Sequence, residues 1–219
     1  SAVSLRLTPL SGVFRRFTRP VREAARSLGK EVVRDVEGED TEADRSIVEN
    51  LFEPLLHVVR NAVDHGLEDA ATRRRGGKPG AGRIRMAAGQ DDNGIVVSVS
   101  DAGRGIDPAF IRSRAVERGL CSAEAAATLD DEALIDLIFA PGFSTAESVG
   151  ALSGRGVGMD VVRAAAVGMV GRVSVESQVG LGTMVRLHLP RTVALARIMV
   201  VEAGGESYGI AMDAVVEVV

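Results

Sequence analysis

The chain has 219 residues, of which 46% are hydrophobic and 26% are charged, and its formal net charge is −4. This composition excludes a disordered chain and predicts one or two domains with a buried core. The negative charge also argues against general nucleic-acid binding, which requires a basic surface to displace counterions from the phosphates.

The first part of the chain predicts two helical segments separated by a strand. Apolar residues at helical spacing favour a helix over residues 11–30, and a short strand over residues 31–36 follows. The segment 42–65 is again helical in its pattern. We interpret residues 69–82 as a glycine-containing loop, and its basic run Arg73-Arg74-Arg75 as solvated rather than as a nucleic-acid patch.

Two β-hairpins are predicted further along. Residues 83–87 and 95–99 flank Asn93-Gly94, a dipeptide that suits a tight turn with positive φ. Residues 172–177 and 184–189 form the second hairpin in the same way. Between the hairpins lies a Gly/Ser-rich stretch at residues 140–156. Helical patterns lie near residues 109–117, 131–139 and 157–170.

The order of these elements predicts the fold class. Because strands come as hairpins while helices come in blocks, we expect an α+β fold, a two-layer sandwich with helices on one face of a mixed, largely antiparallel sheet. Aromatic residues make up only 3% of the chain, so its core should be aliphatic. Beyond Pro190, residues 198–201 and 208–210 indicate the first hairpin of a different domain.

The cellular compartment is indicated by what the sequence lacks. Cys121 is the single cysteine, which excludes an internal disulfide and favours a reducing compartment. No apolar run approaches the length of a membrane span, and no signal-peptide pattern is recognisable. We therefore expect a cytoplasmic location without membrane insertion.

Four short motifs follow one another along the chain and carry its chemistry. Together they supply a metal-binding amide, a base-binding carboxylate, a mobile lid and a phosphate-binding glycine turn, which are the parts of an ATP site. The motifs are His57–Gly66, Asp101–Gly105, Pro141–Ala146 and Ser153–Asp160.

Two side chains in these motifs have a chemistry of their own. Asn61 lies on a predicted amphipathic helix, and its amide oxygen suits Mg²⁺, which prefers oxygen ligands and takes few of them from protein. Asp101 follows a strand, so its carboxylate is placed to accept a hydrogen bond from an exocyclic amine such as that of adenine. Gly103 and Gly105 let a flat ring approach the backbone. Taken singly, the two patterns also fit a solvated asparagine and a plain Asp-Gly turn.

The glycine turn predicts an anion site. Gly154, Gly156 and Gly158 precede a predicted helix, whose free N–H groups and dipole favour phosphate, and Arg155 adds positive charge. The spacing differs from the dinucleotide pattern G-x-G-x-x-G, and the phosphate-loop pattern G-x-x-x-x-G-K-[ST] does not occur. Rossmann and Walker-type sites are therefore disfavoured.

His57 lies four residues before Asn61, on the same helical face. We place it at the triphosphate end of the site rather than as a phosphoacceptor, because a phosphoacceptor must be exposed. A structural histidine remains the alternative, for His57 as for His65.

In order and wording, the four motifs resemble the N, G1, F and G2 boxes of the GHKL ATPases, and most closely those of chemotaxis histidine kinases of the CheA type. Gly76–Pro79 and Gly38–Glu42 are similar to that family as well, so the resemblance covers nearly the whole chain from Arg15 onward. One position differs from the family's usual pattern, since Ala102 stands where the G1 box usually has a second acidic residue. Nucleotide binding should survive this change, because the first carboxylate is the adenine ligand.

The resemblance implies a Bergerat fold that takes ATP and Mg²⁺. It implies that Asp101 is the adenine ligand and that Thr183 supports this carboxylate. It also implies that Asn61 is the Mg²⁺ ligand, and that Asn61 and His57 are catalytic residues. Residues 140–153 would form the ATP lid. The other nucleotide-binding residues that it implies are Asp64, His65, Gly103, Gly105, Ser144, Thr145, Ser153, Gly154, Arg155, Gly156, Val157, Gly158 and Met159.

The resemblance also implies a domain plan and partners. Residues 1–30 would be the tail of a dimerisation helix and its connection, 31–190 the ATP-binding catalytic domain, and 191–219 the truncated start of a CheW-like regulatory domain. Such a kinase works as a homodimer and transfers the γ-phosphoryl of ATP to a histidine on a phosphotransfer domain of the same protein. Its other partners are response regulators, a CheW-like adaptor and, indirectly, chemoreceptors. A GHKL ATPase of another class and a non-catalytic scaffold are the alternatives.

Overall fold

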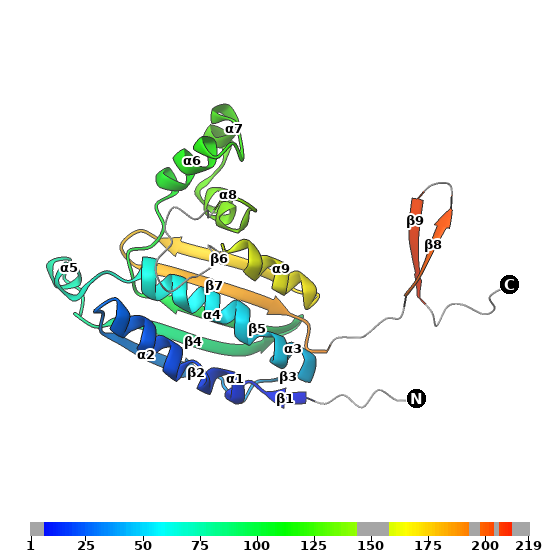
Figure 1. Ribbon diagram of the computed structural model, residues 1–219, viewed down its shortest axis with the longest axis horizontal. Helices are drawn as coiled ribbons and strands as arrows, with labels where there is room; N and C mark the ends of the chain where they lie inside the picture. The colour runs from blue at the N-terminus through cyan, green and yellow to red at the C-terminus, as the bar shows by residue number, and fades with distance from the viewer. Residues whose placement is uncertain (1–6, 144–157, 193–197, 204–205, 212–219) are drawn as a thin grey trace.

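The computed structural model describes residues 7–143, 158–192, 198–203 and 206–211, and its centre is a five-stranded sheet (Figure 1). The strand order is β2-β4-β5-β7-β6, with β2 and β4 parallel and the other neighbours antiparallel. Both predicted hairpins, β4–β5 and β6–β7, are confirmed. The bounds are Val32–Glu37 (β2), Gly82–Asp91 (β4), Gly94–Asp101 (β5), Arg172–Gln178 (β6) and Gly182–Leu189 (β7).

Three helices lie side by side over one face of this sheet: α2 (Thr18–Ser27), α4 (Phe52–Asn61) and α9 (Asp160–Gly168) (Figure 1). The predicted two-layer α+β sandwich is therefore confirmed. A group of three short helices stands beyond one edge of the sheet, next to β6 (Figure 1). These are α6 (Pro108–Glu117), α7 (Ala123–Thr128) and α8 (Asp131–Asp136), the last continued by a 3₁₀ turn at Leu137–Phe139.

The remaining elements are short. Helices α1 (Ser11–Arg15), α3 (Arg45–Asn50) and α5 (Ala70–Arg75) join the larger ones, and a π-helical turn over Ala62–Gly66 extends α4. Two small antiparallel sheets pair β1 (Leu7–Pro9) with β3 (Glu42–Asp44), and β8 (Ile198–Ala203) with β9 (Glu206–Ala211). Among the described residues, no helix is long and apolar enough to cross a membrane.

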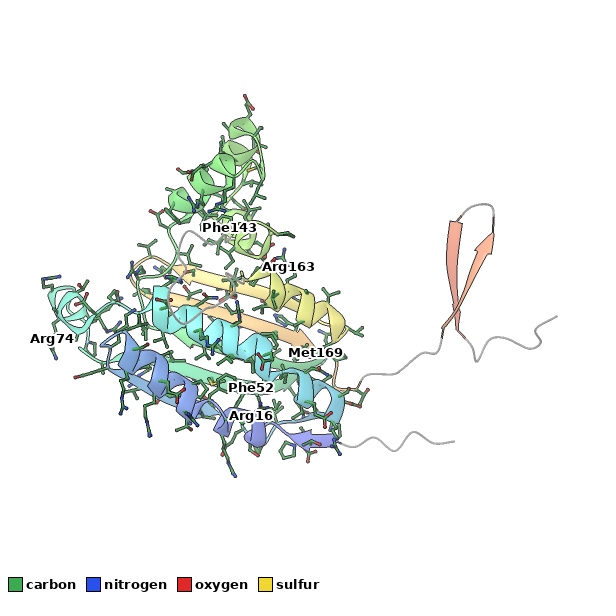
Figure 2. The ribbon with its side chains drawn as sticks, viewed as in Figure 1. Arg16, Phe52, Arg74, Phe143, Arg163 and Met169 are labelled. Carbon is green, nitrogen blue, oxygen red and sulfur yellow. The ribbon has the colours of Figure 1, made fainter. Side chains whose placement is uncertain are left out.

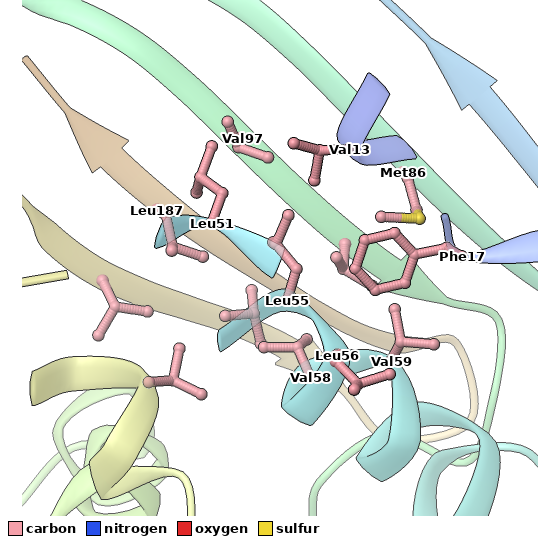
Figure 3. Packing of buried hydrophobic residues seen from close by; sticks show 14 of the residues in the cluster. Val13, Phe17, Leu51, Leu55, Leu56, Val58, Val59, Met86, Val97 and Leu187 are labelled. Carbon is pink, nitrogen blue, oxygen red and sulfur yellow. The ribbon is translucent and has the colours of Figure 1, made fainter. Parts of the chain in front are cut away.

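The core lies between the sheet and its helices, where Figure 3 shows Leu55, Val97 and Leu187 packed together. On β5, Ile95, Val97 and Val99 alternate with outward-facing residues, which is the pattern of a strand with one buried face. The expectation of an aliphatic core holds for most positions. It is wrong for Phe14, Phe17 and Phe139, which are among the largest fully buried side chains.

The N-terminal segment belongs to the same core. Leu10, Phe14, Phe17 and Val21 pack in one hydrophobic cluster with the sheet and α4. The domain boundary that we expect at residue 30 therefore runs between residues that share a core, and the domain plan stays a prediction. The C-terminal hairpin is present as β8–β9.

Three predicted elements differ in detail, each for a local reason. The helix over residues 11–30 is broken between α1 and α2 because Pro20 has no N–H to donate to the preceding turn. The helix over residues 42–65 begins only at Arg45, because Asp44 caps it by accepting a hydrogen bond from the N–H of Ser46 at 2.8 Å. The expected loop at residues 69–82 contains α5, which Asp69 caps through the N–H of Thr72 at 2.9 Å.

Candidate functional site

A cavity of about 490 Å³ opens between α4, the ends of β5 and β7, and α6. Six of the predicted site residues line it: Asn61, His65, Asp101, Gly105, Met159 and Thr183. They come from separate parts of the chain, and the fold brings them together around one space. The remaining wall is mainly apolar and is made by Val58, Ala62, Gly66, Val99, Arg104, Ile106, Asp107, Phe110, Ile111, Ile138, Phe143 and Val185.

Other predicted residues do not line this cavity. His57, Asp64, Gly103 and Gly158 are described but are absent from its wall. His57 lies one turn before Asn61 on α4, and Asp64 lies 3.7 Å from the exposed ring of His65, measured from Oδ2 to Nε2. Ser144, Thr145, Ser153, Gly154, Arg155, Gly156 and Val157, together with most of the predicted lid, lie outside the described residues.

Asp101 ends β5, and the chain around it fixes its carboxylate. The N–H of Gly103 donates to Oδ1 at 2.8 Å, so one oxygen is held from the turn that follows the strand. Gly66 packs directly against the same group, because a Cβ at this position would lie 3.0 Å from Oδ2. Gly182 on β7 has a φ of +125°, and a Cβ there would lie 1.9 Å from the backbone oxygen of Asp101. Glycine is required at this close approach.

This environment changes the acidity of Asp101. Burial raises the pKa of the Asp101 carboxyl from its ordinary value to about 6, while the N–H groups of Gly103 and Thr183 oppose the shift. A carboxyl with such a pKa is ionised at neutral pH and becomes protonated in mildly acidic solution. Perturbed acids in clefts are frequent at functional sites.

Thr183 lies opposite Asp101 in the register of β5 and β7. Its hydroxyl is 2.9 Å from that of Ser177 on β6, and the Ser177 hydroxyl in turn accepts from the N–H of Ile106 at 2.8 Å. Ile106 belongs to the cavity wall. Ser177 thus links two strands to the loop after Asp101, and nothing in the spacing of the motifs marks this role.

Asn61 lies at the end of α4, where the helix changes into the π-helical turn. Its amide nitrogen is 3.0 Å from the sulfur of Met159, a residue of the last motif. Turns of π-helix inside α-helices occur often at functional sites. Here the turn brings Gly66 against Asp101, so the first motif contacts the second.

Lys30 binds the backbone of this π-helical turn. Its ammonium donates to the backbone oxygens of Val63 and Asp64 at 2.7 and 2.8 Å. These carbonyls lie in the last turn of a helix, where partners within the helix run out. The role of Lys30 could not be predicted from the sequence either, because its hydrogen-bond partners are more than thirty positions away.

We expect Lys30→Met to lower the free energy of unfolding by about 1.5–3 kcal/mol, because two charge-assisted hydrogen bonds are lost. Chemical denaturation with urea measures the change. Arg26→Met is the matched control, since Arg26 is exposed on α2 and loses the same charge. An equal effect of both substitutions would show that net charge, and not the contact with the π-helical turn, is responsible.

The basic run at residues 73–75 is only partly solvated. Arg73 is 3% exposed, and its guanidinium donates to Glu68, Ala102 and Pro79. The interpretation of Arg73 as a solvated loop residue is therefore wrong, because its guanidinium is held by the backbone oxygens of the nearby Pro79 and of the distant Ala102. Arg74 and Arg75 are exposed as expected, and Figure 2 shows Arg74 at the outer tip of α5.

Next to the cavity, the segment around α8 is linked to α9 by an ion pair and a cation–π contact. Arg163 on α9 donates to both carboxylate oxygens of Asp136 at 2.7 and 2.6 Å, and its guanidinium lies 4.8 Å from the centre of the Phe139 ring. Arg163 and Phe143 lie close to this junction in Figure 2. The contact orders the segment that carries the cavity residues Ile138 and Phe143.

The arrangement suits a flat, partly polar ring. Most of the wall residues are apolar, and the Asp101 carboxylate, held by the N–H of Gly103, is one of the few polar groups that line the space, which is the usual composition of a small-molecule site. Among the described residues, no group of three or more His, Cys, Asp and Glu side chains is placed to hold a metal ion.

The chain is similar over nearly its whole length to known proteins. The chain is 41% identical over 219 residues to sensor histidine kinase CheAY of Helicobacter pylori, covering 100% of this chain and 27% of that protein. It is 44% identical over 217 residues to chemotaxis protein CheA of Borreliella burgdorferi, covering 99% of this chain and 25% of that protein. The chain thus spans about a quarter of the length of these curated relatives.

A solved structure shows the same fold. The catalytic domain of histidine kinase ThkA superimposes with a TM-score of 0.51 at 14% identity, covering 85% of this chain and 95% of that domain. The family model described as histidine kinase-, DNA gyrase B-, and HSP90-like ATPase matches residues 50–193, which include every described residue of the cavity wall. The chain belongs to the family of histidine kinase-, DNA gyrase B- and HSP90-like ATPases.

Proposed function

We propose that this chain is the ATP-binding kinase domain of a CheA-type histidine kinase, and that it transfers the γ-phosphoryl of ATP to a histidine on a separate phosphotransfer domain. The observation that carries the proposal is the cavity in which Asn61 and Asp101, from two separate motifs, meet around an apolar space. Similarity to the CheA relatives over the whole chain supports the same function.

Asp101 is the proposed adenine ligand. Its carboxylate accepts a hydrogen bond from the exocyclic amine, while apolar residues such as Val58 and Val185 contact the faces of the ring. Thr183 supports the carboxylate from the neighbouring strand, in line with the backbone hydrogen bond that it gives Asp101. Gly103 and Gly105 allow close packing of the turn rather than making room for the ring, since a Cβ at these positions would lie 2.1 Å from the backbone oxygen of Gly66 and 2.2 Å from that of Gln178.

The phosphate end of the site is proposed to lie beside Asn61. The amide oxygen of Asn61 would hold Mg²⁺, and Asp64, His65 and His57 would lie near the phosphates. Bound Mg²⁺ would neutralise charge on the phosphate oxygens during transfer. The proposal assigns the phosphate contacts and the lid to the third and fourth motifs, with the residues Ser144, Thr145, Ser153, Gly154, Arg155, Gly156, Val157, Gly158 and Met159.

In the transfer, the bond between the γ-phosphorus and the bridging oxygen breaks, a bond to the imidazole nitrogen forms, and ADP leaves. The protein's part is to position the reactants and to stabilise charge. The acceptor histidine belongs to the phosphotransfer domain, and His57 on α4 is not that acceptor. We further propose a cytoplasmic location, a homodimer in the full-length protein, and response regulators and a CheW-like adaptor as partners.

The test is to measure ATP binding to the full chain by calorimetry, with and without Mg²⁺, and then transfer to an added CheA-type phosphotransfer domain with labelled ATP. We expect saturable ATP binding and Mg²⁺-dependent labelling of the acceptor histidine. Binding without any transfer would favour a non-catalytic scaffold. Release of inorganic phosphate without labelling would favour an ATPase of another class.

A further inference from the structure

A buried cluster of three charged side chains lies behind the turn that follows Asp101. Glu68 accepts from Arg73 Nη1 at 2.8 Å through one carboxylate oxygen, and from Lys78 Nζ at 2.8 Å through the other. The side chains of Arg73, Glu68 and Lys78 are 2%, 12% and 22% exposed. The cluster is therefore largely shielded from water, and neither the cavity wall nor the proposed nucleotide contacts include it.

Both cations of the cluster also reach the main chain of the Asp101 turn. Arg73 Nη1 donates to the backbone oxygen of Ala102 at 2.8 Å, and Lys78 Nζ donates to that of Gly103 at 2.6 Å. These are the two carbonyl groups that follow Asp101 in the chain. The same Gly103 donates its N–H to the Asp101 carboxylate. A continuous set of hydrogen bonds thus runs from the cluster, through the turn, to the carboxylate.

Stability alone is a weak reason for such a cluster. Buried ion pairs lose solvation when they form, and replacing them with apolar residues is often neutral or stabilising. Here both cations have additional backbone partners, since Lys78 donates to Gly103 and Arg73 Nε also donates to the backbone oxygen of Pro79 at 2.8 Å. Although burial acts in the opposite direction, the hydrogen bond from Lys78 holds the pKa of Glu68 below its ordinary value, so Glu68 remains ionised. The cluster therefore keeps its charges and its geometry at neutral pH.

We propose that Glu68, Arg73 and Lys78 are positioning residues for base recognition: they fix the two peptide groups after Asp101 and so aim its carboxylate into the cavity. The inference rests on the proposed function, because it assumes that Asp101 reads adenine. The inference predicts that the cluster affects binding of the base but not binding of the phosphates. Residues that never touch the nucleotide then set the affinity for its base.

The experiment compares the full chain with Lys78→Met, Lys78→Arg and Arg73→Lys. Lys78→Met removes the hydrogen bonds to Glu68 and Gly103 but keeps an unbranched side chain of similar length. Arg74→Met is the matched control, because Arg74 is exposed on the neighbouring helix α5 and its replacement removes the same charge. Calorimetry measures binding of adenosine, ADP and inorganic tripolyphosphate to each protein, and circular dichroism and thermal unfolding report whether it is folded.

We expect Lys78→Met to weaken adenosine and ADP about fivefold to tenfold, while tripolyphosphate binds as it does to the unchanged chain. Lys78→Arg should restore much of the affinity, since a guanidinium can still donate to both partners. Arg73→Lys should weaken base binding as well, and it tests the proposal independently if one variant fails to fold. Arg74→Met should bind all three ligands unchanged.

Two results would overturn the inference. One is unchanged adenosine affinity in folded Lys78→Met, and the other is an equal loss of adenosine and tripolyphosphate, which a general loss of structure would produce. Failure of the unchanged chain to bind either adenosine or ADP would instead overturn the proposed function, so the two failures can be told apart.

Discussion

Replacing Asp101 with asparagine is expected to weaken binding of ATP and of ADP by the same factor, roughly tenfold or more, because a charge-assisted hydrogen bond to the base is worth about 1.5–3 kcal/mol. Both nucleotides carry the same base, so the extra phosphate of ATP should make no difference to the loss. Calorimetry with the two nucleotides measures it. Unchanged affinity for both would remove Asp101 from the site.

The pH dependence of binding provides a second measurement of the same contact. Because the pKa of the Asp101 carboxyl is raised to about 6, the group is ionised at pH 7 and largely protonated at pH 5. A protonated carboxyl accepts a weaker hydrogen bond, so adenosine affinity should fall as the pH drops from 7 to 5. Adenosine is the right probe because it has no phosphate that titrates. In Asp101→Asn the affinity should stay flat over this range.

The same shift predicts the sign of the effect on stability. Since the pKa in the folded protein lies above that of an unfolded aspartate, the folded state binds more protons between about pH 4 and pH 6. The contribution of Asp101 to the free energy of unfolding therefore decreases as the pH rises through this range. Groups that serve recognition and lower the stability of the fold are common at binding sites.

Replacing Asn61 with alanine is expected to reduce Mg²⁺-dependent transfer to the phosphotransfer domain by roughly a hundredfold, because an oxygen ligand to the metal is lost where charge builds up in the reaction. Binding of adenosine should change little, since Asp101 and the apolar wall remain. Single-turnover transfer of labelled phosphate measures the rate.

The control for this substitution is Asn50→Ala, which removes an amide from an exposed position on α3, where its side chain donates to the backbone oxygen of Ser46. This variant should transfer phosphate at the rate of the unchanged chain. A transfer rate for Asn61→Ala close to that of Asn50→Ala would show that the Asn61 amide is not a required metal ligand.

Hairpins and amphipathic helices could be predicted from the sequence because their signals are local. The alternation of Ile95, Val97 and Val99 and the Asn93-Gly94 turn are enough to indicate the hairpin that ends at Asp101. Local patterns likewise indicated Asn61, Asp101 and Gly105 in the cavity wall, whereas His65, Met159 and Thr183 followed from the family resemblance. Periodicity and turn chemistry therefore carry the elements and part of the site.

The parts that were missed depend on contacts between distant residues. Arg73 reads as a surface residue within a basic run, and only the fold supplies the oxygen of Ala102, 29 positions away, that makes its burial possible. Lys30 and Ser177 act through backbone groups of other elements, and main-chain partners leave no mark in a sequence pattern. The π-helical turn after Asn61 was hidden for a different reason, because its apolar residues continue the stripe of the α-helix before it.

The packing of residues 10–21 has a consequence for how the protein denatures. The family match begins at residue 50, but Leu10, Phe14 and Phe17 are fully buried in the cluster that also holds α4 and the sheet. Side chains that share one core lose their contacts together, so this segment should melt in the same cooperative transition as the cavity. The unit that folds is therefore larger than the segment that the family model matches, and ligand binding in the cavity should slow amide hydrogen exchange in both.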